Sequence, residues 1–255
     1  MRRSYFRLLE GVLFSLPLLF ASCGNGDNAL EEIINGGGSG SGGGGSESSG
    51  TYLVYSYAIG TGISSEETQI PSDAKTDADM TNSWAGTYYI KSNKTITGDV
   101  TFTDNVKLIL KDGVELTVNG CIYGGADYGT AGTYSLYVYA QSGNTGALTI
   151  NSNDGFDVVV DKLEIHGGVI HASNSEQAFE PNGEFKIYNG NVTAEGTMNG
   201  IMIMNKMYVY GGTLTATSTT DPTAGGSYGI SGNFTMYDGN VTTTGGDAAT
   251  GTSVS

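Results

Sequence analysis

The residues best suited to binding chemistry are aromatic and recur at one position of a repeat. His166, Tyr188, Tyr210 and Tyr237 each precede a two-residue turn, at intervals of 22, 22 and 27 residues. If the strands that carry them are stacked, their rings lie about 4.8 Å apart as a surface ladder. Such a ladder can stack against sugar rings, because Tyr offers a flat face and a hydroxyl. Tyr208 is predicted to widen it. The alternative is a ladder that only straightens the edge of the stack.

A second candidate is a cation site in the segment from residue 151 to residue 161. Asn153, Asp154 and Asp157 supply amide and carboxylate oxygens at close spacing, and calcium prefers such ligands. The Gly in this segment does not fit the pattern of an EF-hand loop, so a polar turn between strands is the alternative. Calcium is therefore the candidate cofactor, with these three residues as its predicted ligands.

Catalysis has less support in the sequence. Enzymes that eliminate across a uronate need a base, frequently Arg, but every Arg lies within the first seven residues. His166, His171 and eight Lys are the bases that are left. Glycosidases need clustered acids, and the outward positions of the repeat hold no such cluster. Cys121 is read as a small buried residue rather than a nucleophile. We therefore expect no catalytic residues.

Composition excludes other classes of partner. The 255 residues carry a formal charge of −15, and only 15% of them are charged. An acidic surface without guanidinium groups repels phosphates, so we expect no nucleic-acid partner. The chain is nevertheless 38% hydrophobic and 10% aromatic, which is enough to build a core.

The elements that must position the aromatic residues are short alternating strands. The residues 163–172, 185–194, 207–216 and 234–243 align without gaps. A period near 22 residues with two strands around a Gly turn predicts an all-β fold, a single-stranded right-handed parallel β-helix of seven or eight coils. Alternate residues such as Leu163 and Ile165 are predicted to face the core. The residue before each turn Gly is predicted to adopt the left-handed conformation.

Part of this pattern resembles a known family. The segments 86–90, 98–102, 108–120 and 139–150, together with the later strands, resemble right-handed β-helix lipoproteins of bacteria described as carbohydrate-binding domain-containing proteins. The resemblance spans about residues 86–243. It implies a surface protein that binds polysaccharide, including acidic polysaccharide with calcium. The motifs that carry it specify the fold far better than the ligand.

The N-terminal region resembles a lipoprotein export signal. Basic residues precede a short apolar run that ends at Cys23, the predicted lipidation site. We expect a signal peptide at 1–22, a lipidated N-terminus and Gly/Ser tether at 23–50, a cap or irregular segment at 51–85 and the β-helix at 86–255. The lipid would be the only membrane contact, at the cell surface of a bacterial outer membrane. The edge of the last coil is expected either to be covered by a partner or to result from a truncated gene product.

These features predict a non-catalytic, cell-surface protein that binds polysaccharide through its Tyr ladder, with calcium as a candidate aid. Two alternatives stay open at this point. One is a structural or adhesive surface protein with a protein partner, and the other is a β-helix polysaccharide lyase.

Overall fold

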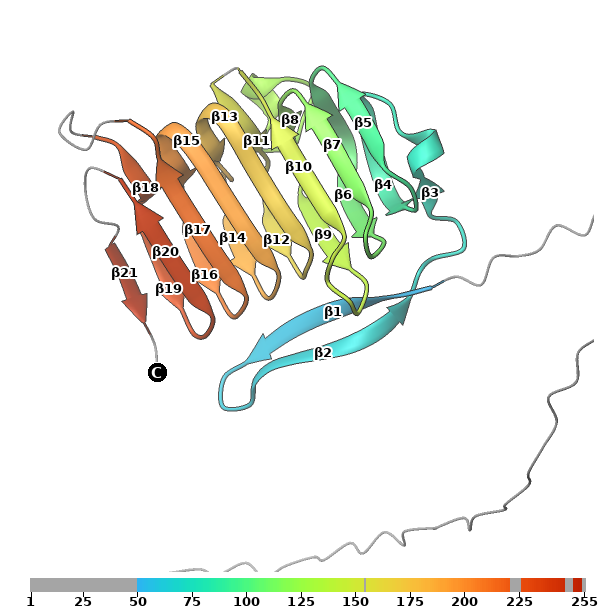
Figure 1. Cartoon of the computed structure of the whole chain (residues 1–255), viewed down its shortest axis with the longest axis horizontal. Helices are drawn as coiled ribbons and strands as arrows, with labels where there is room; N and C mark the ends of the chain where they lie inside the picture. The colour runs from blue at the N-terminus through green and yellow to red at the C-terminus, as the bar shows by residue number, and fades with distance from the viewer. Residues whose placement is uncertain (1–49, 154, 221–225, 246–249, 254–255) are drawn as a thin grey trace, which may run out of the picture. The chain divides into compact units, whose positions relative to one another are not determined.

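The computed structural model describes residues 50–153, 155–220, 226–245 and 250–253. The predicted signal peptide, Cys23 and nearly all of the tether therefore lie outside the described residues. The described part contains no α-helix, and nineteen of its strands form one sheet (Figure 1). Every pairing between described strands of this sheet is parallel, for example that of β14 with β16. The fold is a parallel β-helix, as the repeat predicts.

The strands of the β-helix fall into three parallel ladders, and four long strands bend from one ladder into another. The first ladder contains β3 (Lys75–Thr76), β4 (Ser83–Ile90), β6 (Val100–Leu110), β9 (Leu136–Ala140), β12 (Leu163–Ile165), β14 (Glu184–Ile187), β16 (Lys206–Val209), β19 (Asn233–Met236) and β21 (Thr250–Ser253). The second contains β5 (Lys94–Thr97), β7 (Glu115–Asn119), β10 (Ala147–Asn151), β13 (Val169–Phe179), β15 (Asn191–Met202), β17 (Thr213–Ser218) and β20 (Asn240–Thr244).

The third ladder contains the first residues of β4 and β6, then β8 (Ile122–Tyr123), β11 (Phe156–Val159), the last residues of β13 and β15, and β18 (Tyr228–Ser231). Two short 3-10 helices, η1 (Asp77–Asp79) and η2 (Tyr128–Thr130), interrupt the strands. The second ladder has seven strands among the described residues, which matches the predicted number of coils.

The register of the ladders confirms the alignment of the repeat. Leu163 pairs with Phe185, Phe185 with Met207, and Met207 with Phe234. These positions and their i+2 neighbours point inward, and all but those of the last coil are buried. Parallel strands covered on the inner face stack their apolar residues into one continuous core. The core therefore runs along the whole helix axis and fixes which side chains face outward.

The turn between the first and second ladders is made differently from the prediction. The residue with positive φ is the second residue of the turn, always Gly, and not the residue before it: Gly168, Gly190, Gly212 and Gly239. A Cβ atom at Gly212 would lie 2.6 Å from the carbonyl oxygen of Gly190 on the coil below. The stacked turns therefore require Gly both for its backbone conformation and for the close approach of neighbouring coils.

The segment from 51 to 85 divides into two parts. Its second part covers the first coil, because Met80 and Trp84 are buried in the core and the Trp84 indole donates to the Thr81 carbonyl at 2.7 Å. Its first part is an antiparallel hairpin of β1 (Thr51–Ala58) and β2 (Gly62–Gln69). The hairpin forms a separate sheet and lies along the side of the β-helix, beside the turns of successive coils (Figure 1).

Candidate functional site

The predicted aromatic ladder exists, and it is one ring longer than expected. Ring centroids lie 4.6 Å apart for His166 and Tyr188, 4.9 Å for Tyr188 and Tyr210, and 5.1 Å for Tyr210 and Tyr237. Tyr139 of the preceding coil extends the stack, 4.5 Å from His166. All four pairs are within 20° of parallel. The spacing matches the distance between stacked strands.

The backbone of the first ladder holds these rings in register. The amide N–H of Tyr188 donates to the carbonyl of Ile165, and that of Tyr210 donates to the carbonyl of Ile187, both at 2.8 Å. Since Ile165 and Ile187 point into the core, the next residue on each strand points outward. The aromatic ladder is therefore a direct consequence of the repeat.

The hairpin covers one half of the aromatic ladder. The N–H of Tyr55 in β1 donates to Nδ1 of His166 at 3.0 Å, and the Asn189 amide donates to the hydroxyl of Tyr55 at 2.7 Å. The ring of Tyr52 packs edge-on against Tyr139 at 5.0 Å. Only 4% of His166 and 8% of Tyr139 are exposed. His166 belongs to the stack as predicted, but it does not offer the exposed face that we expected.

The other half of the aromatic ladder is open and meets the tip of the hairpin. Tyr57 of β1 stacks on Tyr210 at 4.6 Å and contacts Tyr237 at 4.5 Å with the two rings tilted by 40°, and all three rings are half-buried. A hollow of about 460 Å³ adjoins these rings. It is lined by the three Tyr residues, by Ile59, Gly60, Gly62 and Ile63 of the hairpin, and by Asp238. We call this hollow the ladder-end site.

The two remaining predicted ligand-binding residues are Tyr208 and Tyr188. Tyr208 lies next to the ladder-end site, and Tyr188 lies between the open and the covered parts of the aromatic ladder. The Tyr208 ring is 5.9 Å from that of Tyr210 and half-buried. Asn189, next to Tyr188, contacts the hairpin. The sequence reasoning missed Tyr57 and Asp238. The alternation of Tyr55 and Tyr57 along a strand is the signal that could have indicated an aromatic face, but it does not show what that face packs against.

The electrostatics of this side of the molecule are set by burial and by a short ion-pair chain. Burial, followed by the neighbouring Tyr188, raises the pKa of Tyr210 to about 12, so its hydroxyl stays protonated at neutral pH. Lys186 lies 2.8 Å from Glu184 and 3.2 Å from Glu164. Partial burial opposes its charge, but these two carboxylates raise the pKa of Lys186. The ammonium is thus held between two acids.

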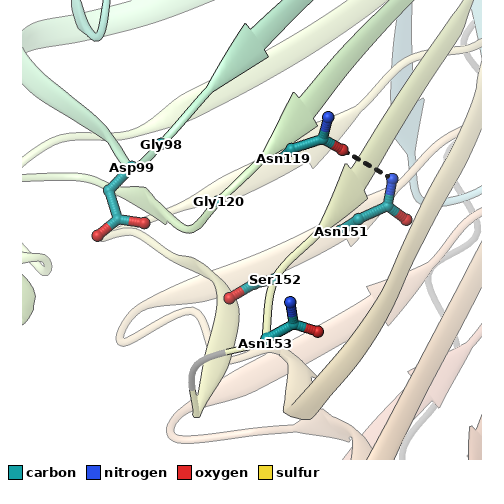
Figure 2. Close-up of a pocket in the computed structure, with 7 residues that line it drawn as sticks. All are labelled: Gly98, Asp99, Asn119, Gly120, Asn151, Ser152 and Asn153. Atoms are coloured by element: carbon teal, nitrogen blue, oxygen red, sulfur yellow. Dashed lines mark hydrogen bonds between the residues drawn. The ribbon is translucent and has the colours of Figure 1, made fainter.

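A second hollow of about 430 Å³ lies where the strands β5, β7 and β10 of the second ladder end (Figure 2). It is polar, and it is lined by Gly98, Asp99, Asn119, Gly120, Asn151, Ser152 and Asn153. Figure 2 shows the amides of Asn119 and Asn151 side by side, with the Asn151 nitrogen donating to the Asn119 oxygen at 3.3 Å. Oδ1 of Asp99 accepts the N–H of Cys121 at 2.9 Å. Carboxylate, amide and hydroxyl groups thus meet here.

Of the three predicted calcium ligands, Asn153 and Asp157 are among the described residues. Asn153 lines the polar hollow, whereas Asp154 lies outside the described residues. Asp157 is buried, and its Oδ1 accepts the N–H of Ser152 at 2.9 Å, so it fixes the turn of the chain. Within the described ranges, no group of three or more His, Cys, Asp or Glu is arranged to hold a metal ion. Calcium binding stays a prediction.

Cys121, His166 and His171, the residues considered for catalysis, each lie close to a polar side chain. Cys121 is buried, as expected for a small core residue, and its sulfur lies 3.0 Å from the Ser152 hydroxyl. Nε2 of His171 lies 3.7 Å from a carboxylate oxygen of Glu195, and both side chains are partly exposed. His166 contacts a different acid, Glu164, at 3.7 Å. The two His residues thus belong to separate contacts.

Comparisons with known proteins add no name to this site. No protein family model matches the chain, and no curated protein or solved structure is significantly similar to it. In the part of the chain that the structure describes, no helix is long and apolar enough to cross a membrane. The function must be argued from the geometry of the parallel β-helix and its exposed tyrosine cluster.

Proposed function

We propose that the chain is a non-catalytic carbohydrate-binding protein, held by a lipid on Cys23 at the surface of a bacterial outer membrane. The observation that carries this proposal is the ladder-end site, where Tyr57, Tyr210 and Tyr237 bring three half-buried rings together beside a hollow. Sugar rings present apolar C–H faces between their hydroxyls, and tyrosine matches both features. A polysaccharide chain would stack here, with Tyr208 extending the contact.

The chemistry of the ladder-end site supports binding rather than cleavage. Asp238 is the one carboxylate among the residues that line the hollow. Hydrolysis of a glycosidic bond requires a pair of carboxyl groups on either side of it. Elimination requires a base, and Lys186 is held as a cation between Glu164 and Glu184. A polysaccharide lyase is therefore the weaker proposal.

A structural or adhesive protein is the second candidate. β2 pairs with β1 alone among the described strands, so its outer edge is open to a strand from another protein. Glu66 and Glu67 are exposed on this strand, and such charges discourage unselective pairing. A partner on this edge would need to be basic.

Affinity measurements on a polysaccharide panel separate these functions. We would run the full chain, purified in detergent, through gels that contain neutral, basic or acidic polysaccharides, with calcium or with a chelator. Retardation without new reducing ends or unsaturated product is the expected result. Unsaturated product would establish a lyase. If no polysaccharide retards the chain in either condition, carbohydrate binding is wrong.

A pair of variants tests whether the ladder-end site carries the binding. Replacing Tyr210 and Tyr237 by Ala together should abolish retardation, because both rings that face Tyr57 are removed. The control is Tyr128→Ala, which removes an exposed Tyr of η2 that stacks on Phe156, outside the aromatic ladder. If both variants retain the wild-type affinity, the ladder has a structural role only. Loss of calcium-dependent binding in Asn153→Ala would connect the polar hollow to calcium.

A further inference from the structure

The charges around the ladder-end site indicate which sugars it accepts, an inference that rests on the proposed carbohydrate binding. We propose that this site selects glycans with free amino groups, such as glucosamine units, over neutral glycans, and that it disfavours uronates. An ammonium group would contact the carboxylate of Asp238 and the face of Tyr237 that does not stack on Tyr210.

The carboxylate of Asp238 is placed where a bound sugar would meet it. It directly follows Tyr237, the last ring of the aromatic ladder, and it lines the hollow together with Tyr57 and Tyr210. Its Oδ1 accepts the N–H of Gly239 at 2.7 Å, which fixes the carboxylate beside the turn. A carboxylate has four lone-pair positions, so it can accept an ammonium as well.

The Tyr rings strengthen the preference for a cation. A ring face is electronegative, and an ammonium above it is attracted even at an exposed site. Tyr210 stacks on Tyr188 on one side and on Tyr237 on the other, so the ring face offered to an ammonium is the outer face of Tyr237. The Tyr210 hydroxyl stays protonated at neutral pH and can donate to sugar hydroxyls. Three rings and one carboxylate around one hollow combine the two groups that recognise ammonium ions.

A uronate finds no compensating charge at this site. None of the residues that line the hollow is Lys, Arg or His. Lys186 contacts Glu164 and Glu184, and Lys206 is the register neighbour of Glu184 on the next coil. Together with Asp238, these five side chains carry a net charge of −1. Within the screening distance of about 8 Å in physiological salt, the Asp238 carboxylate in the lining repels a second carboxylate. The chain's overall charge of −15 acts in the same direction.

The test uses four hexasaccharides with the same β-1,4-linked backbone and different charges. They are the hexamers of glucosamine, N-acetylglucosamine, glucose and glucuronate, titrated into the full chain in detergent by calorimetry in physiological salt. The glucosamine hexamer should bind about three- to tenfold more tightly than the glucose hexamer, from one exposed cation–π contact and one exposed ion pair. N-acetylation should remove this gain, and the glucuronate hexamer should bind most weakly.

Two variants distinguish a local preference from a general attraction of cations to an acidic protein. Asp238→Asn keeps an oxygen that can accept the Gly239 N–H but removes the charge, so the glucosamine-to-glucose affinity ratio should fall towards one. Glu195→Gln removes the same charge from an exposed residue of β15 and should leave the ratio unchanged. Equal ratios in the two variants would overturn the proposal.

The outcomes also separate this inference from the proposed function. If the glucose or glucuronate hexamer binds best, and Tyr237→Ala weakens that binding, carbohydrate binding stands and the preference for amino sugars is wrong. If no hexasaccharide binds and no polysaccharide in the gel panel retards the chain, the proposed function is wrong and the preference falls with it.

Discussion

The stacked Gly turns make a quantitative prediction, because two Gly residues share one backbone conformation and differ in their surroundings. Gly212 has φ of +79° and Gly86 has φ of +78°. A Cβ atom at Gly86 would meet no atom within 4 Å, whereas one at Gly212 would lie 2.6 Å from the Gly190 oxygen and 3.0 Å from the carbonyl carbon of Asn189. Comparing Gly86→Ala with Gly212→Ala therefore isolates the close approach of coils from the backbone strain.

The expected free energies follow from these two contributions. The left-handed conformation costs an L-residue about 1–2 kcal/mol, and a less flexible unfolded chain offsets about 0.4–1 kcal/mol of this. Gly86→Ala should thus lower the free energy of unfolding by about 1 kcal/mol. At Gly212 the new methyl must also push two coils apart, and such overpacking costs about 1–3 kcal/mol. Gly212→Ala should therefore cost about 2–4 kcal/mol.

Urea unfolding followed by circular dichroism measures both variants against the wild type. The comparison is valid where the dependence on urea concentration is the same in all three proteins. A larger loss for Gly212→Ala by about 1–3 kcal/mol is the expected result. If the two losses agree within about 0.5 kcal/mol, the spacing between coils does not require Gly at this turn, and the reasoning is refuted.

Three further substitutions test the packing of the hairpin and of the β-helix. His166→Phe keeps a ring in the aromatic ladder but removes the acceptor of the Tyr55 N–H. Because an unpaired buried donor costs about 1–3 kcal/mol, hydrogen exchange in the hairpin should accelerate by roughly tenfold. Unchanged exchange would show that this hydrogen bond does not hold the hairpin. Burial raises the pKa of Glu180, so the native state binds this proton more tightly and loses stability as pH rises through the folded pKa. Glu180→Gln should therefore raise the melting temperature at pH 7 by a few degrees, and this gain should disappear near pH 4. Phe185→Ala should lower the free energy of unfolding by about 3–5 kcal/mol in urea titrations, because the side chain is fully buried; a loss below 1 kcal/mol would contradict its place in the core.

The sequence was sufficient for the β-helix because the repeat is local and redundant. Leu163, Phe185, Met207 and Phe234 occupy the same position of the repeat, and each pairs with the next. Alternation within each strand then determines which residue faces outward, so the aromatic ladder was predictable from the same pattern. The right-handed sense of the coils stays a prediction, as do the lipid anchor and the calcium.

The hairpin could not be predicted in the same way, because its contacts are distant in the sequence and occur only once. Tyr55 and His166 are 111 residues apart, and Asn189 is 134 residues from its partner Tyr55. Outward positions on a strand are also predicted to be exposed unless another element covers them, which is why His166 was expected at the surface. Asp238 could not be identified from the sequence, because the hollow that it lines is formed partly by the tip of the hairpin.

The aromatic ladder was interpreted either as a binding surface or as a structural element. The position of the hairpin means that these two interpretations apply to different parts of the ladder. Tyr139 and His166 are almost fully covered by β1, so substitutions there act on the stability of the hairpin. Tyr210 and Tyr237 contact the ring of Tyr57 in the hairpin and border the hollow of the ladder-end site. Substitutions in this part are the ones that bear on ligand binding. An experiment that removes a residue of the covered part and loses binding would therefore report hairpin displacement, unless the hairpin is shown to remain docked.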